Sequence, residues 1–404
     1  MADAEEMARE RQGSGPLAGV KVLDFSSYIA APYGATLLAD YGADVIKIEP
    51  PHGDAVRQYP STLETESRAY VGLNRSKSDI VLDLKKPEAR AVIDRLVADS
   101  DVLVHNFRPA VPERIGLGWE RLREINPRLI YCSVTGYGES GPMRDRPGFD
   151  QVLQAMTGMA RCQGTEEAGP TIVWGSVVDY YTSSMLAFSV ASALFERERS
   201  GRGQKIGVSL LQSALTMQSA RLVWADGETA QVDRDFRSLG TTAIYPTVEG
   251  WLYLTTTADH FWHAFCEIAG LPELAHDARY DTTRKRATRS AELVPVIAKA
   301  LMARPAEEWE RLFGDRVPSA AARGTEEVFD NPQVLAEGLV RTFDHPVLGS
   351  YRGICKPASF SETPCPAPRA APLLGEHTRE ILAGHGFTDA EIQDLAGCGA
   401  VTWG

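Results

Sequence analysis

The stretch GVKVLDFSSYIAAPYGATLLADYGADVIKIEP, residues 19–50, decides the fold class. Residues 19–25 form a β-branched run, and residues 43–50 form a second one. Between them, residues 32–42 have the apolar spacing of a helix, with a proline at its start and a glycine at its end. The three segments therefore predict one strand–helix–strand unit.

The same alternation continues along the chain. Residues 79–84 and 101–107 predict two strands, separated by a helix that begins near Pro87. Residues 129–138 predict a further strand after another helix. Strands and helices that alternate with short loops are typical of a mostly parallel sheet covered on both faces. We therefore predict an α/β protein with a doubly wound, Rossmann-like large domain.

The composition excludes several classes of protein. The 404 residues are 44% hydrophobic and 24% charged, as in a soluble globular protein with two or three domain-sized cores. A net charge of −12 disfavours a nucleic-acid or anionic-membrane partner, since both need a basic face. The six cysteines form no CxxC pair, and His260 and His263 have no third ligand nearby, so we predict neither a disulfide framework nor a metal site. The charged N-terminus lacks an apolar segment, so we predict a cytoplasmic protein with a disordered lead over residues 1–15.

The segments that leave the strands are where a doubly wound sheet binds its ligand. They contain neither GxGxxG nor GxxxxGK[ST], which argues against a dinucleotide site and a P-loop. They do offer a helix N-terminus near Pro32 and several basic side chains, which together suit a polyanionic ligand. The basic residues are Lys77, Arg108, Arg114, Arg144 and Arg146.

A single carboxylate, Asp179, stands between valines and tyrosines in WGSVVDYYTSSMLAFSVASALFERERSGRG, residues 174–203. The apolar residues after it cover nearly every helical face and predict a helix that is buried on most sides and stops at Gly201. Asp179 then lies near the helix start, where its carboxylate can accept backbone N–H groups. A poorly hydrated carboxylate is also a stronger nucleophile toward an activated acyl group. The pattern is compatible with both roles.

From about Pro16 to Leu382 the chain resembles the family III CoA-transferases, a group that includes formyl-CoA and carnitine CoA-transferases and the 2-methylacyl-CoA racemases. The segments that carry the resemblance include residues 17–54, NRSKSDIVLDLKKPE, DVLVHNFRPAVPERIG and VVDYYTSSMLAFSVASALFERERSGRG. The resemblance implies that Asp179 attacks an acyl-CoA thioester to give a mixed anhydride, after which a carboxylic acid leaves as the new CoA ester. The implied partners are an acyl-CoA and a small carboxylic acid, with no tightly bound cofactor. A nucleophilic carboxylate needs no general base, so no histidine partner is required.

The resemblance also assigns the CoA contacts. The matching positions are Ile29, Ala30, Lys77, Asn106, Phe107, Arg108, Arg114, Thr135, Gly136, Tyr137 and Gly138. Formyl-CoA transferase-like proteins have glutamine where Ile29 stands and arginine where Pro50 stands. The first departure argues against formate or oxalate as substrate, and the second removes one CoA contact. Glycines in LGTTAIYPTVEGW, residues 239–251, are the expected source of backbone donors for an oxyanion.

Two other functions stay open. The racemases pair the aspartate with a histidine in a GHD triplet, because moving a proton between two faces of a carbon takes an acid and a base. Here the triplet is GFD, with Phe149 at the histidine position, which favours the transferase. Asp150 matches both subfamilies, and we expect it to be a structural or oxyanion-site neighbour. The third possibility is a CoA-binding protein without catalysis, since an aspartate that only caps a helix would also be found at position 179.

The domain organisation follows from the same patterns. We predict that residues 16–225 form the first part of the large domain and that residues 341–404 return to complete it. Residues 226–340 form a smaller α+β domain with its linkers, which begins with a hairpin around Gly250 and a helix that contains Trp262. The resemblance implies an interlocked homodimer.

Overall fold

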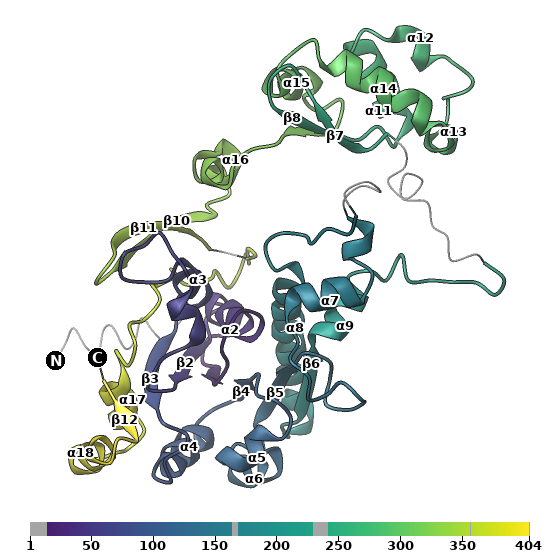
Figure 1. The fold of residues 1–404 in the computed structure, drawn as a ribbon. Helices are drawn as coiled ribbons and strands as arrows, with labels where there is room; N and C mark the ends of the chain where they lie inside the picture. Colours follow the sequence, from purple (N-terminus) through teal and green to yellow (C-terminus); the bar gives the residue numbers. More distant parts are fainter. Residues whose placement is uncertain (1–13, 164–168, 229–240, 356, 404) are drawn as a thin grey trace. The chain divides into compact units, whose positions relative to one another are not determined.

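A computed structural model describes residues 14–163, 169–228, 241–355 and 357–403 (Figure 1). The chain divides into two compact units. Unit 1 runs to Leu222 and resumes at Gln333, and unit 2 spans Val223–Pro332. Among the described residues, no helix has the length and apolar character needed to cross a membrane.

Unit 1 is built on a seven-stranded sheet with the strand order β12-β3-β2-β1-β4-β5-β6. The strands are β1 (Lys21–Asp24), β2 (Asp44–Glu49), β3 (Ser78–Leu82), β4 (Val102–His105), β5 (Ile130–Thr135), β6 (Lys205–Ser209) and β12 (Val401–Thr402). Neighbouring strands from β1 to β6 pair in parallel, and only the edge strand β12 runs antiparallel. The predicted mostly parallel sheet is confirmed. Its order reverses between β1 and β4, as in doubly wound nucleotide-binding folds.

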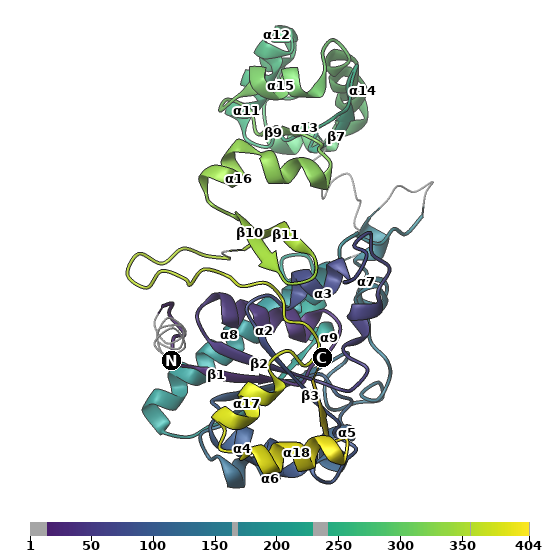
Figure 2. The ribbon, with the colours of Figure 1, turned by 90° about the vertical axis from the view of Figure 1, so that its left-hand side faces the viewer.

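Helices cover both faces of this sheet (Figure 2). The helices of unit 1 are α2 (Ala30–Asp40), α3 (Arg68–Leu73), α4 (Ala89–Ala98), α5 (Val111–Ile115), α6 (Trp119–Ile125), α7 (Asp150–Met156), α8 (Val177–Ser200), α9 (Leu210–Thr216), α17 (Thr378–Gly384) and α18 (Asp389–Gly397). One more helix, α16 (Pro332–Ala336), begins at the boundary between the two units and does not cover the sheet. Short 3-10 turns η1 (Ala55–Gln58) and η2 (Ala160–Cys162) and an antiparallel hairpin, β10 (Val340–His345) with β11 (Gly349–Ile354), complete the unit.

Each face of the sheet has its own apolar core, because successive residues of a strand point to opposite faces. On one face, Val22 and Val104 pack with α2, α7, α8 and α9. On the other, Leu23 and Leu103 pack with α4, α6, α17 and α18. The sequence analysis does not predict β6 or β12. β12 has only two residues, and β6 is half exposed, so neither leaves a buried apolar run to detect.

The long helix α8 ends where the sequence predicts, with Gly201 in the left-handed conformation at φ 70°. The prediction that it is buried on most sides is wrong for the single chain. Phe188 is 66% exposed and Phe195 is 69% exposed, although Leu186 and Val190 are fully buried. The sequence pattern shows that a helix face is apolar, but it does not distinguish a core contact from a surface contact.

Unit 2 contains a three-stranded antiparallel sheet in the order β7-β8-β9, with helices packed on it. Its elements are β7 (Ala243–Pro246), β8 (Trp251–Leu254), α11 (Asp259–Ile268), α12 (Pro272–Ala275), α13 (Thr283–Thr288), α14 (Ser290–Leu301), α15 (Ala306–Phe313), β9 (Ser319–Ala321) and η3 (Thr325–Asp330). The predicted hairpin around Gly250 and the helix that contains Trp262 are both confirmed. Residues 239 and 240, at the start of the segment expected to supply oxyanion donors, lie outside the described residues.

Candidate active site

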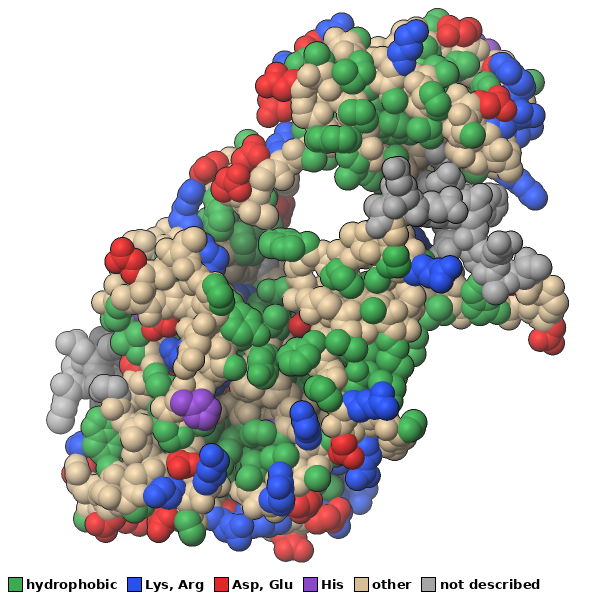
Figure 3. All heavy atoms as spheres, in the orientation of Figure 1, with side chains coloured by type: hydrophobic (Ala, Val, Ile, Leu, Met, Phe, Trp, Pro, Cys, Tyr) green, Lys and Arg blue, Asp and Glu red, His purple; other side chains and the backbone are tan. Residues whose placement is uncertain are grey.

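A pocket of about 390 Å³ opens at the carboxyl ends of β1, β4 and β5. This is the point where the strand order reverses, and therefore the place where a doubly wound sheet binds its ligand. On the face drawn in Figure 3, acidic and basic side chains are interspersed on each unit, so the site is defined by the pocket rather than by a broad charged surface. Most predicted site residues line the pocket: Ile29, Ala30, Asn106, Phe107, Arg108, Thr135, Gly136 and Asp179.

Four predicted CoA contacts do not line the pocket: Lys77, Arg114, Tyr137 and Gly138. Tyr137 donates a hydrogen bond from its hydroxyl to the carbonyl of Pro147 at 3.2 Å, and Gly138 donates its backbone N–H to Thr135 Oγ1 at 3.0 Å. Both bonds hold the turn that follows β5. Arg114 is exposed on α5 and does not line the pocket.

Lys77 is not brought to the pocket either, because its ammonium is buried inside unit 1. Its Nζ donates to Asp24 Oδ2 at 2.7 Å, to the carbonyl of Pro32 at 2.8 Å and to Asn74 Oδ1 at 2.9 Å. An ammonium has three N–H donors, so these bonds use all of them. Burial lowers the pKa of Lys77 to about 8, against the opposing effect of the Asp24 carboxylate. The structure thus places Lys77 beneath the start of α2 as an internal support.

The loop between β1 and α2 is held almost entirely by side-chain bonds to its backbone. Asn106 accepts from the N–H of Ser27 at 3.1 Å and donates to the carbonyl of Ser27 at 2.7 Å. Lys47 donates to the carbonyl of Ser26 at 3.0 Å, and Asp24 accepts from the N–H of the same residue. We call this loop together with the first three residues of α2, residues 25–32, the clamped side of the pocket.

Tyr28 is the most constrained residue of the clamped side. Its φ of 69° lies in the left-handed region, which side chains with a Cβ seldom adopt. Asp54 accepts from the N–H of Tyr28 at 3.1 Å and forms a fully buried ion pair of 2.9 Å with Lys47. The ring of Tyr28 meets that of Phe149 edge to face, with 5.8 Å between centroids. The buried ion pair thus fixes a strained backbone that presents an aromatic ring to the pocket.

The start of α8 is capped by a residue of another helix. Asp150 Oδ2 accepts from the N–H of Val178 at 2.6 Å and from the N–H of Asp179 at 3.1 Å. The prediction that Asp179 itself accepts backbone N–H groups is therefore wrong, because Asp150 takes the two donors of this turn that point at a carboxylate. Ser176, the residue before α8, has a φ of 55° and makes no side-chain cap.

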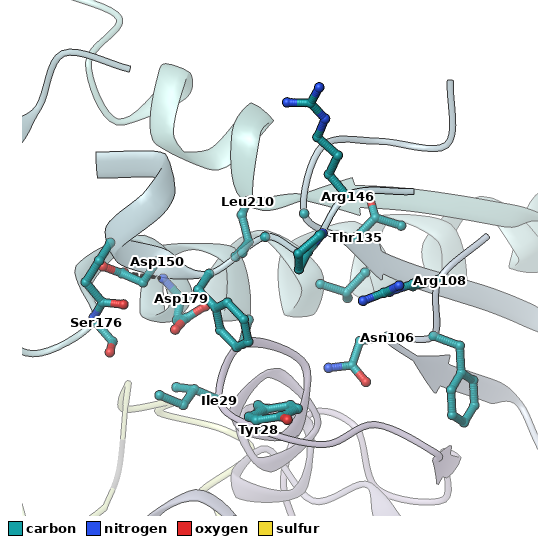
Figure 4. A pocket seen from close by; sticks show the side chains of 18 of the residues that line it. Tyr28, Ile29, Asn106, Arg108, Thr135, Arg146, Asp150, Ser176, Asp179 and Leu210 are labelled. Atoms are coloured by element: carbon teal, nitrogen blue, oxygen red, sulfur yellow. Dashed lines mark hydrogen bonds between the residues drawn. The ribbon is translucent and has the colours of Figure 1, made fainter. Parts of the chain in front are cut away.

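Asp179 faces the pocket without a partner for its carboxylate (Figure 4). Within the part of the chain that the structure describes, no side chain or backbone group forms a hydrogen bond to its carboxylate oxygens. Burial raises the pKa of Asp179 to about 7, and the negative charge of Asp150 contributes to the increase.

The opposite side of the pocket carries arginines. Figure 4 shows Arg108 and Asn106 across the pocket from Asp150 and Asp179. Arg108 and Arg146 are exposed, and no residue in the described ranges pairs with either guanidinium, whereas Arg144 forms an ion pair with Asp145 at 3.0 Å. We call Arg108 and Arg146 the open side of the pocket. Free guanidinium groups at the mouth of a pocket are suited to phosphate or carboxylate oxygens.

The turn behind the open side depends on two glycines. A Cβ at Gly136 would lie 2.9 Å from the Cα of Gly148, and a Cβ at Gly148 would lie 2.7 Å from the Cα of Gly136. The end of β5 and the segment before α7 therefore cross too closely for any side chain. This approach brings Phe149 and Asp150 next to the end of the sheet.

Sequence reasoning missed some residues that line the pocket. Tyr28 and Ser176 both have left-handed backbones, and no pattern in the sequence marks such a conformation for a residue other than glycine. Tyr59 directly follows η1, which is separated from the end of β2 by a loop. Leu210 follows β6, a strand that the sequence analysis does not predict. The described residues contain no group of three or more His, Cys, Asp or Glu side chains that could hold a metal ion.

Comparisons with known proteins agree with this arrangement. Residues 17–378 match the sequence profile of CoA-transferase family III. The succinyl-CoA:glutarate CoA-transferase of Mus musculus is 32% identical over 373 residues, which cover 91% of this chain and 86% of that protein. The acetyl-CoA:oxalate CoA-transferase of Acetobacter aceti is 35% identical over 332 residues, which cover 81% of this chain and 85% of that protein.

A solved structure shows the same fold. The crystal structure of a CAIB/BAIF family protein from Brucella suis superposes with a TM-score of 0.80 at 28% sequence identity, and the match covers 92% of this chain and 100% of that one. The profile match extends over both parts of unit 1 and all of unit 2. The chain belongs to CoA-transferase family III.

Proposed function

We propose that the protein transfers CoA from an acyl-CoA thioester to a carboxylic acid, with Asp179 as the nucleophile. The observation that carries the proposal is the position of Asp179: its carboxylate faces a pocket at the carboxyl edge of the sheet and has no hydrogen-bond partner among the described residues. Asp179 is half-buried, and a half-buried carboxylate without donors is poorly solvated, which makes its ionised form a good nucleophile toward a thioester carbonyl.

The chemistry proceeds without a proton donor. A carboxylate oxygen of Asp179 bonds to the thioester carbonyl carbon, and the C–S bond breaks with its electron pair on the CoA thiolate. The thiolate then attacks the side-chain carbonyl of Asp179, which releases the first acid and leaves an aspartyl-CoA thioester. The acceptor carboxylate attacks that thioester and expels the thiolate, which gives a second mixed anhydride between Asp179 and the acceptor. The thiolate then attacks the acceptor's carbonyl carbon, and the C–O bond of the anhydride breaks to free the Asp179 carboxylate. Each step exchanges one anionic nucleophile for another, so no histidine is needed.

The CoA contacts are proposed for the residues that line the pocket. Ile29 and Ala30 lie at the start of α2, while Asn106, Phe107 and Arg108 follow β4 and Thr135 and Gly136 follow β5. Lys77, Arg114, Tyr137 and Gly138 do not line the pocket, and we propose a supporting role for Lys77. The exposed guanidinium of Arg108 supplies a charge suited to the phosphates of CoA.

The acceptor is proposed to be a small dicarboxylic acid. Two relatives, with 32% and 35% sequence identity to this chain, carry the names succinyl-CoA:glutarate CoA-transferase and acetyl-CoA:oxalate CoA-transferase. Arg146, which lines the pocket and is unpaired within the described ranges, supplies a second positive charge for a distal carboxylate. Ile29 stands where formyl-CoA transferase-like proteins have glutamine, which argues against formate or oxalate as the acid.

The two other candidate functions have weaker support. Phe149 lines the pocket in place of the histidine of the racemases, and none of the described residues that line the pocket is a histidine, so the histidine partner of the racemase reaction is missing there. A binding protein without catalysis would have no need for an unpaired carboxylate next to Asp150, since the cap of α8 is already supplied.

The interlocked homodimer is proposed as the assembly. The exposed rings of Phe188 and Phe195 give α8 an apolar surface that a second copy would cover. Light scattering on the purified protein tests the assembly, and a monomer at micromolar concentration would exclude it.

The decisive experiment is mass spectrometry of the acyl-CoA products. The purified protein is incubated with succinyl-CoA or acetyl-CoA and a pool of mono- and dicarboxylic acids. We expect new CoA esters of dicarboxylic acids, and none with the Asp179→Asn variant at equal CoA binding. Transfer by that variant at the wild-type rate would exclude Asp179 as the nucleophile. Deuterium uptake at the α-carbon of a 2-methylacyl-CoA, without new esters, would establish the racemase instead.

A further inference from the structure

Two carboxylates, those of Asp150 and Asp179, lie at the start of α8, and only Asp150 accepts hydrogen bonds from the backbone N–H groups there. Asp150 comes from the first turn of α7 and accepts from the N–H groups of Val178 and Asp179 through one oxygen. Its other oxygen accepts from Nε2 of Gln154. Asp150 is 1% exposed and both of its carboxylate oxygens accept hydrogen bonds, whereas the Asp179 carboxylate, in the first turn of its own helix, has no bond from any described residue.

We propose that Asp150 is a positioning residue of the transfer reaction: it occupies the N-terminus of α8 in place of Asp179 and so leaves the Asp179 carboxylate unpaired, poorly solvated and directed into the pocket. The inference rests on the proposed function, in which Asp179 is the nucleophile. A carboxylate near a helix N-terminus is normally stabilised by the free amides there, and that stabilisation lowers its reactivity. Here the amides act on the neighbour instead.

The backbone before α8 shows that this arrangement is built into the fold. Gly175 and Ser176 both have left-handed conformations, which turn the chain sharply into the helix. Gln154 holds the approach to this turn, because it accepts from the N–H of Val173 at 2.8 Å and donates to the carbonyl of the same residue at 3.1 Å. Asp150 and Gln154 thus form one buried pair that bonds to the backbone at both ends of the turn, and only Asp150 carries a charge.

The charged and titratable groups around Asp179 come from several elements. They are Asp150 from α7, Tyr180 from α8 itself, Tyr28 from the clamped side, Tyr59 after η1, and Arg108, Arg144 and Arg146 across the pocket. Besides burial, Asp150 is the group that raises the pKa of Asp179. The tyrosines are affected in the reverse direction, since the charge of Asp179 contributes to raising the pKa of Tyr59 and of Tyr180.

The consequence for catalysis is a more basic nucleophile. A carboxylate of higher basicity attacks a thioester carbonyl more readily in its ionised form. Asp150 makes and breaks no bond in the reaction and exchanges no proton with the substrate. Its effect is exerted on Asp179 through charge and through the two amides that it occupies, so it should be visible in the titration of Asp179.

The test measures that titration directly and does not depend on activity. The protein is labelled with carboxyl-¹³C aspartate, and the Asp179 resonance is assigned by its absence in the Asp179→Asn variant. We expect wild-type Asp179 to titrate with a midpoint at about 7. In Asp150→Asn, which keeps the shape and one acceptor oxygen but removes the charge, we expect the midpoint to fall by about one pH unit or more, equivalent to at least a tenfold change in proton affinity.

Gln154→Leu is the matched control, because it removes the bonds of Gln154 to Asp150 and Val173 but leaves the charge of Asp150 in place. We expect it to lower the melting temperature and leave the Asp179 midpoint within about 0.3 pH units of wild type, a change equivalent to a factor of about two. An Asp150→Asn midpoint equal to that of wild type would overturn the proposal. If Asp150→Asn does not fold, a wild-type midpoint near the ordinary aspartate value of 3.8 would overturn it equally.

The kinetic readout separates this inference from the proposed function. With the substrate pair found by mass spectrometry, the acid limb of kcat against pH should lie near the wild-type midpoint and shift with it in Asp150→Asn. A shifted titration in a protein that makes no CoA esters would refute the proposed function while the pairing of the two carboxylates stands. If Asp150→Asn transfers CoA normally and the acid limb of its kcat against pH does not shift, the positioning role of Asp150 is refuted, but the proposed function is not.

Discussion

The two sides of the pocket are held in opposite ways. The clamped side is fixed by buried charges: Lys47 and Lys77 are 0% and 1% exposed, and both donate to backbone carbonyls of residues 25–32. The open side presents Arg108 and Arg146 to solvent with no partner among the described residues. In the sequence all of these are basic residues near strand ends. The difference between them teaches that burial, not residue type, separates a cation that supports the site from one that is free to bind a ligand.

The energetics of the two sides explain why they differ. A buried charge is costly unless it is paired and its remaining donors are bonded, so Lys47 and Lys77 are tied to Asp54 and Asp24 and have little freedom to rearrange. An exposed guanidinium has no such cost and keeps its donors for an anion. The clamped side therefore keeps its geometry before any ligand arrives, while the open side gains its partners from the ligand.

The largest effect should come from breaking the clamped side at Lys77. Lys77→Met leaves Asp24 buried beside an apolar side chain and removes the bond to Pro32, so we expect the free energy of unfolding to fall by about 3–5 kcal/mol. Urea unfolding followed by circular dichroism measures it. CoA affinity of the folded fraction at low temperature should stay close to that of wild type, since Lys77 does not line the pocket.

An exposed ion pair provides the control for this variant. Lys21 pairs with Asp99 at 2.6 Å, and the two side chains are 46% and 56% exposed. Lys21→Met should change the free energy of unfolding by no more than about 0.5 kcal/mol. Equal stability of Lys77→Met and wild type, together with lost CoA binding, would show that Lys77 belongs with the ligand contacts and would remove the distinction between the two sides.

Asp179 lies between the two sides and should show how much stability an unpaired, half-buried charge costs. Its pKa is about 7 in the folded chain against an ordinary value of 3.8, so the folded state binds the proton more tightly and loses stability as the pH rises between these values. The full loss, at most about 4 kcal/mol, is present above pH 7. Asn does not ionise, so Asp179→Asn should be more stable than wild type at pH 8.

Thermal unfolding across pH tests this prediction. The stability advantage of Asp179→Asn should shrink as the pH falls from about 7 toward the ordinary aspartate value of 3.8 and vanish below that value, where the wild-type carboxyl becomes protonated in both the folded and the unfolded chain. Asp145→Asn, which changes an exposed carboxylate in an exposed ion pair, should show no comparable trend. A variant that is less stable than wild type at pH 8 would mean that the Asp179 carboxylate is bonded in the folded protein.

The sequence predicts the sheet well because parallel strands leave long buried runs. Residues 43–50 and 129–138 predict β2 and β5 to within a few residues, and Gly201 predicts the end of α8. The edge strands β6 and β12 leave no such run and are missed. Asp179 stands out in the sequence as a charge in an apolar stretch, and the structure places it in the pocket.

The parts of the site that the sequence does not predict depend on contacts between distant segments. Asp150 caps α8 from 28 residues away in the chain, and nothing near either residue indicates the pairing. Lys77 and Arg108 are equivalent as sequence patterns, and only the contacts of Lys77 with Asp24, Pro32 and Asn74 in the folded chain separate the two. The left-handed backbone of Tyr28 is imposed by Asp54 and Asn106, which lie on other loops.

The smallest effect on stability, and a specific effect on binding, should come from Arg108 on the open side. Arg108→Met removes an exposed guanidinium with no partner among the described residues, so the free energy of unfolding should stay within about 0.5 kcal/mol of wild type. We expect the CoA dissociation constant to rise by about tenfold, equivalent to about 1.4 kcal/mol, and calorimetry measures it. The difference in CoA affinity between wild type and Arg108→Met should narrow as salt is added, because an exposed charge is screened.

Arg114, which is also exposed but lies on α5 and does not line the pocket, provides the control. Arg114→Met should leave the free energy of unfolding and the CoA dissociation constant unchanged. If Arg114→Met weakens CoA binding as much as Arg108→Met does, the effect is one of net charge, and the open side has no specific contact with the ligand.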